Sequence, residues 1–163
     1  MALVAVVSDT HLPRGSRRLP EECLRRLAAA DLIVHAGDLC SLGALAELHA
    51  LGPPVAAVHG NADHDAVRAA LPAELVAEVG GARIAVTHDA GRREGREARL
   101  VARFGGCEAV VYGHSHLPQV SRHGGVWILN PGSPTERRRA PSRTMLELDV
   151  EVGQIQPRLI ELT

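Results

Sequence analysis

The stretch that decides the fold is residues 3–11, LVAVVSDTH, which joins an apolar run to two polar side chains. Residues 3–7 are apolar and rich in valine, a pattern typical of a strand buried on both faces of a parallel sheet. Asp9 and His11 follow directly, so we expect a carboxylate and an imidazole at the carboxyl end of that strand. Taken alone, the pair has an equally good interpretation as a helix-cap or loop pair.

Four further apolar runs end in the same way. They read LIVHA (32–36), PVAAVH (54–59), RIAVT (83–87) and EAVVY (108–112). The motifs that close or follow them are Gly37-Asp38, Gly60-Asn61, Thr87-His88 and Gly113-His114-x-His116. The carboxyl ends of parallel strands meet at one edge of a sheet. We therefore expect one site on the rim of one sheet, formed by Asp9, His11, Asp38, Asn61, His88, His114 and His116.

The first half of the chain has the pattern of an α/β protein. Helices are expected at about 20–30, 41–51 and 63–72, where Pro20 suits a first turn and Ser41 and Asp63 suit N-caps. These helices alternate with the strands at 3–7, 32–36 and 55–59. Such a βαβαβ order favours parallel strands with helical crossovers.

The second half is richer in strands. Gly80-Gly81, Gly124-Gly125 and Gly153 mark tight turns between the strand pairs 74–79 and 82–87, 119–122 and 126–129, and 144–152 and 154–162. A helix is expected at 92–104 and a buried strand at 108–112. We therefore expect a single domain over residues 1–163, with two packed mixed sheets flanked by helices.

Composition excludes several classes of protein. The formal net charge is −1 and aromatic residues make up 2%, which argues against a nucleic-acid surface and against base-stacking platforms. All 18 basic residues are arginine, so Schiff-base and P-loop lysine chemistry is excluded. No apolar run approaches the ~20 residues of a membrane span. The N-terminus has no basic segment or cleavage site, so a cytoplasmic protein is expected. Three cysteines without CxxC spacing are expected to be small buried residues.

The seven polar side chains form a set that suits two divalent metal ions. Carboxylates with four imidazoles favour Mn²⁺, Ni²⁺, Fe or Zn²⁺ over Ca²⁺ or Mg²⁺, and Mn²⁺ is the first expectation. Asp38 has two oxygens and can bridge ions ~3.5–4 Å apart, while His114 and His116 can each serve one ion. Two carboxylates against two divalent ions leave about +2, which favours an anionic ester and a hydroxide.

The motif series SDTH, HAGD, HGNAD, TH, GHSH and NPGS resembles that of the calcineurin-like metallophosphoesterases, and within them the small YfcE-like phosphodiesterases. The resemblance extends from residue 4 to about residue 135. It implies a four-layer αββα sandwich of two mixed β-sheets flanked by helices, with the metals at the strand ends. It also implies one ion held by Asp9, His11, Asp38 and His116, and another held by Asp38, Asn61, His88 and His114.

The resemblance implies a phosphodiesterase that hydrolyses a small phosphate ester by in-line attack of a metal-bridging hydroxide. Two positions depart from the family pattern. Ala62 stands where larger phosphatases have a histidine that assists the reaction, and Asp89-Ala90 stands where this branch often has Gly-His. Without that acid, activated diesters are expected to react better than alkyl monoesters. His64 and His59 are weak candidates to assist the leaving group or the metal ligands.

Other motifs have simpler interpretations. His35 is expected to be a hydrogen-bonded core residue, while His49 and His123 are expected at the surface. Asn130-Pro131-Gly132-Ser133 suits a turn that returns the chain to the metal loops. The arginines at 92, 93, 96, 99 and 103 favour a solvated helix face, with an interface or a phosphate clamp as alternatives.

Two other functions remain as alternatives. One is a non-catalytic interaction scaffold, because the eukaryotic retromer subunit resembles this branch; its kind shows eroded metal ligands, whereas all seven residues are present here. The other is a nuclease, which would need a basic groove that a net charge of −1 does not favour. A homodimer is expected from the frequency of C₂ association among small domains.

Overall fold

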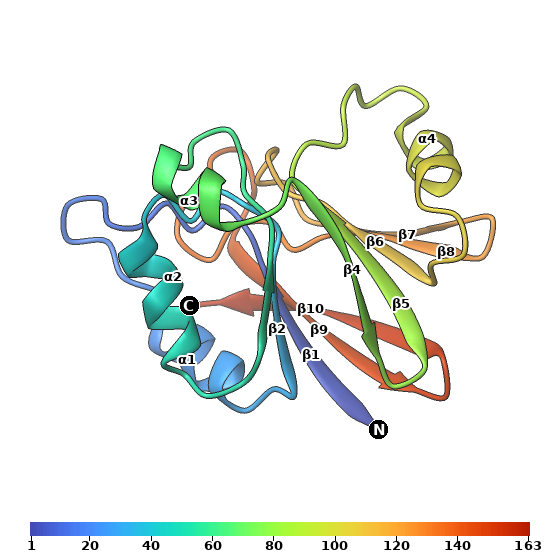
Figure 1. The fold of residues 1–163 in the computed structure, drawn as a ribbon, viewed down its shortest axis with the longest axis horizontal. Coiled ribbons are helices and arrows are strands. Elements are labelled where there is room, and N and C mark those ends of the chain that lie inside the picture. The colour runs from blue at the N-terminus through green and yellow to red at the C-terminus, as the bar shows by residue number, and fades with distance from the viewer.

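Ten strands form two five-stranded mixed sheets in the computed structural model, which describes residues 1–163 (Figure 1). In spatial order, the first sheet consists of β10 (Gln154–Leu162), β9 (Arg143–Glu151), β1 (Ala2–Val7), β2 (Leu32–His35) and β3 (Val55–Ala57). The second sheet consists of β4 (Glu74–Val79), β5 (Ala82–Thr87), β6 (Ala109–Val111), β8 (Val126–Asn130) and β7 (Gln119–His123).

The pairing explains why the chain divides into an α/β half and a strand-rich half. β1, β2 and β3 pair in parallel, as the βαβαβ pattern predicts, and β9 and β10 add to β1 as an antiparallel hairpin. In the second sheet β5, β6 and β8 are parallel, while β4 and β7 are antiparallel edges. The turn between β4 and β5 places Gly80 and Gly81 at φ of 55° and 80°, the left-handed values that a tight hairpin needs.

Alternate residues of the strands face two different cores. Val4 and Val6 of β1 pack between the sheets with Ile84 and Val86 of β5. Ala5 of β1 faces the other way, into the core beneath the helices α1 (Glu21–Ala28), α2 (Leu42–His49) and α3 (Asp65–Ala70). A third core lies under α4 (Arg96–Arg103), which covers β6 and β8 of the second sheet. The predicted αββα sandwich is therefore confirmed.

The helices differ from prediction mainly at their starts. Ser41 caps α2 as predicted, because its hydroxyl accepts from the Ala44 N–H at 3.1 Å. The predicted cap by Asp63 is wrong: the N-cap of α3 is His64, and the Asp63 carboxylate binds other backbone groups. α4 begins at Arg96, four residues later than predicted. None of the four helices has the length and apolar character needed to cross a membrane.

Candidate metal centre

Loops from both sheets bring the seven predicted side chains together. Asp9 and His11 follow β1, Asp38 follows β2, and Asn61 follows β3 of the first sheet. The remaining three, His88, His114 and His116, follow β5 and β6 of the second sheet. The expectation of a rim on one sheet is therefore wrong. Packed sheets lie about 10 Å apart, so loops at the same end of both can reach a common point.

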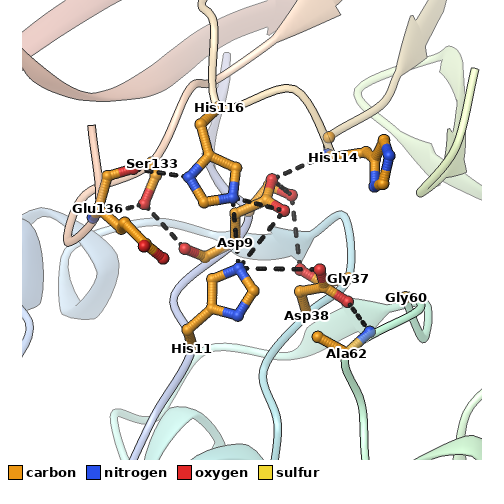
Figure 2. Close-up of polar contacts among 12 residues, drawn as sticks. Asp9, His11, Gly37, Asp38, Gly60, Ala62, His114, His116, Ser133 and Glu136 are labelled. Atoms are coloured by element: carbon orange, nitrogen blue, oxygen red, sulfur yellow. Dashed lines mark hydrogen bonds and ion pairs between the residues drawn. The ribbon is translucent and has the colours of Figure 1, made fainter. Parts of the chain in front are cut away.

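Three of the side chains form an inner group: Asp9, His11 and His116. The Nε2 atoms of His11 and His116 are 3.3 Å apart, and the rings face each other beside Asp9 (Figure 2). Asp9 Oδ1 lies 3.4 Å from His116 Nε2 and 3.9 Å from His11 Nε2. All three residues are buried. These atoms are close enough to share one ion.

Three others form an outer group: Asn61, His88 and His114. The oxygen Asn61 Oδ1 lies 3.0 Å from both His88 Nε2 and His114 Nδ1. His88 is buried, whereas Asn61 and His114 are exposed. The outer group is therefore the side of the centre that solvent and a ligand can reach.

The two carboxylates lie between the groups. Asp38 Oδ2 is 3.2 Å from His88 Nε2 and 3.7 Å from His11 Nε2. Asp9 Oδ1 is 3.9 Å from His88 Nε2, so the Asp9 carboxylate also faces both groups. A second cluster suited to an ion accordingly consists of Asp9, Asp38 and His88. The geometry makes both Asp38 and Asp9 able to contact two ions.

Hydrogen bonds aim the free atoms of these residues at the centre. His88 Nδ1 donates to the Ala36 carbonyl at 2.7 Å and His116 Nδ1 donates to the Glu136 carbonyl at 2.6 Å, which leaves each Nε2 facing inward. Asp9 Oδ2 accepts from the Ser8 hydroxyl and from the His114 N–H. Such outer contacts are the usual means of fixing the tautomer and direction of metal ligands.

One buried oxygen of the centre, Asp9 Oδ1, has no hydrogen-bond partner. A buried carboxylate oxygen without a hydrogen bond costs free energy, so its position calls for a cation. The 3.3 Å between the two inner Nε2 atoms also fits a shared ion, since metal–nitrogen bonds are about 2.1 Å long. The donor set and its geometry therefore fit divalent metal ions.

The electrostatics show the same demand for positive charge. Burial lowers the pKa of His88, but the contact with Asp38 and the charge of Asp9 outweigh burial, so its pKa is raised. Burial raises the pKa of Asp38, but the contact with His88 outweighs it and the pKa is lowered. Without a metal, a proton on His88 would neutralise part of the carboxylate charge, and a metal ion competes with that proton.

The ligand loops have an unusual backbone. Asp9, His11, Asp38, His114 and His116 all have positive φ, and they account for five of the eight such non-glycine residues. This conformation is costly for most residues and collects at functional sites. The glycines before these ligands leave no room for a side chain. A Cβ on Gly37 would lie 2.6 Å from His88 Nδ1, and a Cβ on Gly113 would lie 2.7 Å from Asp9 Oδ2.

Sequence reasoning missed the role of Asp63. Its buried carboxylate accepts from the N–H groups of Asp38 (3.0 Å), Cys40 (2.6 Å) and Gly60 (2.6 Å). It therefore joins the loop that carries Asp38 to the loop that carries Asn61. The only available signal was its position two residues after Asn61, which helix capping explained equally well.

The turn at residues 130–133 has the supporting role that was predicted. Ser133 Oγ donates to the Asp9 carbonyl at 2.8 Å, and Asn130 Nδ2 donates to the Gly113 carbonyl at 3.1 Å. Thr135 Oγ1 adds a bond to the Thr10 carbonyl at 2.8 Å. The turn thus ties the loop of Asp9 to the loop of His114.

His35 is a hydrogen-bonded core residue, as predicted. Its Nδ1 accepts from the Gly37 N–H at 3.1 Å, so its Nε2–H donates to Thr10 Oγ1 at 3.0 Å. Complete burial lowers its pKa to about 4, with Asp63 and Asp9 opposing the shift. The neutral ring connects the loop that carries Asp9 to the loop that carries Asp38.

The remaining histidines and cysteines lie outside the inner and outer groups. His64 is exposed at the start of α3 and His59 is half-buried, and neither side chain contacts the seven residues. His49 and His123 are exposed, as predicted. Cys23 and Cys107 are buried as predicted, whereas Cys40 is half-buried and lies 3.6 Å from His11 Nδ1.

Comparisons with known proteins agree with this geometry. A model of the calcineurin-like phosphoesterase superfamily domain matches residues 2–153. A "Probable metallophosphoesterase" of Methanothermobacter thermautotrophicus is 34% identical over 153 residues, 91% of this chain and 87% of the relative. One of Methanocaldococcus jannaschii is 32% identical over 163 residues, 98% of this chain and 81% of the relative.

A solved structure shows the same fold at lower identity. Vps29 of Entamoeba histolytica, complexed with Zn²⁺, has a TM-score of 0.77 at 23% identity, over 99% of each chain. The family match and the two archaeal relatives show the superfamily, and the solved structure shows the fold. The chain belongs to the calcineurin-like metallophosphoesterase superfamily.

Proposed function

We propose that this protein is a binuclear metal-dependent phosphodiesterase that acts on small phosphate esters. The observation that carries the proposal is the convergence of three histidine Nε2 atoms on the unpartnered Asp9 Oδ1 and on Asp38 Oδ2. When bound, two divalent ions would lower the pKa of a water molecule and neutralise phosphoryl oxygens. Mn²⁺ is the first candidate, with Ni²⁺, Fe and Zn²⁺ as alternatives.

The ligands divide between the two ions according to their positions. One ion would be held by Asp9, His11, Asp38 and His116, and the other by Asp38, Asn61, His88 and His114. The assignment is supported by the 3.3 Å between the inner Nε2 atoms and by the 3.0 Å contacts within the outer group. Asp38 is proposed as the bridge because its Oδ2 faces a histidine of each group.

The chain's own residues would position the ester from the open side. Asn61 and His114 are exposed, so the phosphoryl group would approach the outer group while the inner group stays closed to solvent. No side chain is placed as a general acid: Ala62 has none, and His64 points from the start of α3 without contacting the centre. Substrates with good leaving groups are therefore favoured, since an alcohol would depart unprotonated.

The test uses purified protein loaded with Mn²⁺, with bound metal measured per chain. We expect hydrolysis of bis(4-nitrophenyl) phosphate at least tenfold faster than of 4-nitrophenyl phosphate. The two esters have the same leaving group, but the second negative charge of the monoester repels the attacking hydroxide. Equal inertness toward both esters, with two ions bound, would exclude the enzymatic function. Faster hydrolysis of the monoester would indicate a phosphatase and contradict the proposed phosphodiesterase activity.

A non-catalytic scaffold is the second candidate, favoured by the likeness to Vps29. That structure is itself titled as a Zn²⁺ complex, so metal binding alone does not separate the two functions. The complete set of seven ligands supports the enzyme. A protein that binds two ions, hydrolyses neither ester and stays inert with several metals would favour the scaffold.

A further inference from the structure

A groove of about 830 Å³ lies between the start of α4 and strand β7, and its lining includes Ser115, the residue between His114 and His116. Figure 1 shows α4 and the segment before it projecting from the second sheet near β7 and β8. Tyr112, Ser115 and Gln119 line one side of the groove, and Arg93 and Arg96 line the other. Its volume suits a small organic molecule, since ligand pockets typically measure about 300–1,000 Å³.

Residues that line the groove are close in sequence to residues of the outer group. Ser115 lies between His114 and His116, and Tyr112 comes two residues before His114. Consecutive Cα atoms are about 3.8 Å apart, so the groove wall begins within one residue of the exposed His114. The opposite wall follows His88 by only a few residues. A substituent on a phosphoryl group at the outer group would extend into this groove.

The groove lining has two arginines and one glutamate, and neither arginine forms an ion pair with that glutamate. The exposed Arg93 side chain makes no hydrogen bond or ion pair, and only the Arg93 carbonyl is bonded, to the Arg96 N–H. Arg96 donates to the Tyr112 hydroxyl at 3.2 Å and to the Gly91 carbonyl at 2.8 Å, and its Nε has no partner. Glu97, the one acidic residue of the lining, already accepts from Gln119 and lies 3.6 Å from His123 Nδ1. The Arg93 side chain is therefore free to bind an anion, and Arg96 adds a positive charge that Tyr112 and Gly91 hold in place.

The wall that bears these arginines is held in place. Arg99 donates to the carbonyls of Glu94 and Arg92, and Arg96 donates to that of Gly91, so the segment before α4 is pinned to the helix. The Arg96 guanidinium also lies 5.1 Å from the Tyr112 ring centroid. A binding surface that is ordered in advance loses less entropy when a ligand binds.

We propose that this groove is a substrate subsite for phosphodiesters whose second substituent carries a further phosphate, which Arg93 and Arg96 would bind. The inference rests on the proposed function and narrows its substrate class. Arginine suits this role because its planar fork binds phosphate oxygens with two hydrogen bonds. The charge run at residues 92–99 would then be a phosphate clamp and not only a solvated face.

The test compares two esters that differ by one phosphate: thymidine 5′-(4-nitrophenyl phosphate) with and without a 3′-phosphate. In the Mn²⁺-loaded protein we expect kcat/KM to be at least tenfold higher for the 3′-phosphorylated ester, which corresponds to about 1.4 kcal/mol. The Arg93→Gln/Arg96→Gln variant should reduce that ratio to about one. The ratio is the measure, and not the rate on either ester alone, because the double variant also loses the Arg96 contacts with Tyr112 and Gly91.

Arg25→Gln is the matched control, because Arg25 is an exposed arginine on α1, on the opposite sheet. Its ratio of the two kcat/KM values should equal that of the wild type. Equal kcat/KM for the two esters in the wild type would contradict the subsite. An unchanged preference for the 3′-phosphorylated ester in the double variant would also contradict it. Arg93→Gln alone removes no side-chain hydrogen bond or ion pair, so it should fold as the wild type does and should still lower the ratio.

Direct binding separates this inference from the enzymatic function. Calorimetric titration of the Mn²⁺-loaded protein with thymidine 3′,5′-bisphosphate and with thymidine 5′-monophosphate needs no turnover. Tighter binding of the bisphosphate that the arginine variants abolish would support the groove even if neither ester is hydrolysed. Equal affinity for both nucleotides would reject the subsite and leave the phosphodiesterase proposal untouched.

Discussion

The inner and outer groups of the candidate metal centre each contain two histidines but differ in exposure to solvent. Asp9, His11 and His116 are buried, and backbone groups fix the Asp9 and His116 side chains. Asn61 and His114 are exposed and contact each other at 3.0 Å. The difference in burial indicates that the inner group would hold an ion away from solvent, whereas the outer group would admit a ligand. Mutations should therefore have larger effects on the inner group.

Asp38→Asn should give the largest effect, because Asp38 Oδ2 faces a histidine of each group. The change removes a negative charge and a donor oxygen that both ions would share. We expect metal content to fall below one ion per chain and turnover to fall about 10³-fold, or about 4 kcal/mol. Two ions per chain with near-normal turnover would show that the bridge is misassigned.

Acid should destabilise the metal-free protein through His35, which supports the inner group. The pKa of His35 is about 4 in the folded protein and 6.5 in the unfolded chain. Between these pH values the folded state therefore binds fewer protons than the unfolded state. The stability from the neutral ring is complete above pH 6.5 and is lost as pH falls toward 4, by about 3 kcal/mol. Urea unfolding from pH 7 to 4 measures this.

The His35→Gln variant provides the comparison, since an amide can still donate and accept but does not titrate. Its free energy of unfolding should fall less between pH 6.5 and pH 4 than that of the wild type. Parallel losses in the two proteins would mean that other groups cause the acid sensitivity.

His116→Ala and His114→Ala compare the groups directly. His116 is fully buried, so its removal opens a cavity and leaves Asp9 with one contact fewer. We expect His116→Ala to lower turnover about 100-fold more than His114→Ala, and to lower the free energy of unfolding by about 2 kcal/mol. Steady-state kinetics and urea titration measure both. A greater loss in His114→Ala would reverse the assignment of the two groups.

Asp63→Asn should weaken the connection between the groups. One amide oxygen replaces two carboxylate oxygens that accept from the N–H groups of Asp38, Cys40 and Gly60. Metal affinity should fall about 10- to 100-fold, the usual cost of losing a residue that orients a ligand. Asp65→Asn is the matched control, because Asp65 is exposed in the first turn of α3. Equal metal titrations for both variants would remove Asp63 from the site.

His64→Ala and His59→Ala should give the smallest effects. Neither side chain contacts the seven residues, so two ions per chain and a free energy of unfolding within about 0.5 kcal/mol of wild type are expected. Metal analysis and urea unfolding measure both. Loss of metal in His64→Ala would place the centre on the other side of that loop.

The strands could be predicted from sequence because their signal is local. All ten expected strands form within a few residues of their predicted ends, since apolar runs and glycine turns carry the pattern. Asp63 could not be predicted in this way. An aspartate before a short helix has a sufficient local explanation as a cap, and two of its three backbone donors, Asp38 and Cys40, are distant in sequence.

The sequence by itself determined which seven side chains are candidates for a metal centre, because ligand chemistry depends on residue type and each motif follows its strand. Only the tertiary structure decided that the centre spans two sheets, that Asp9 faces both groups, and that the inner group is dry while the outer group is open. Burial and the distance between side chains depend on how two sheets pack, and no local pattern encodes that packing.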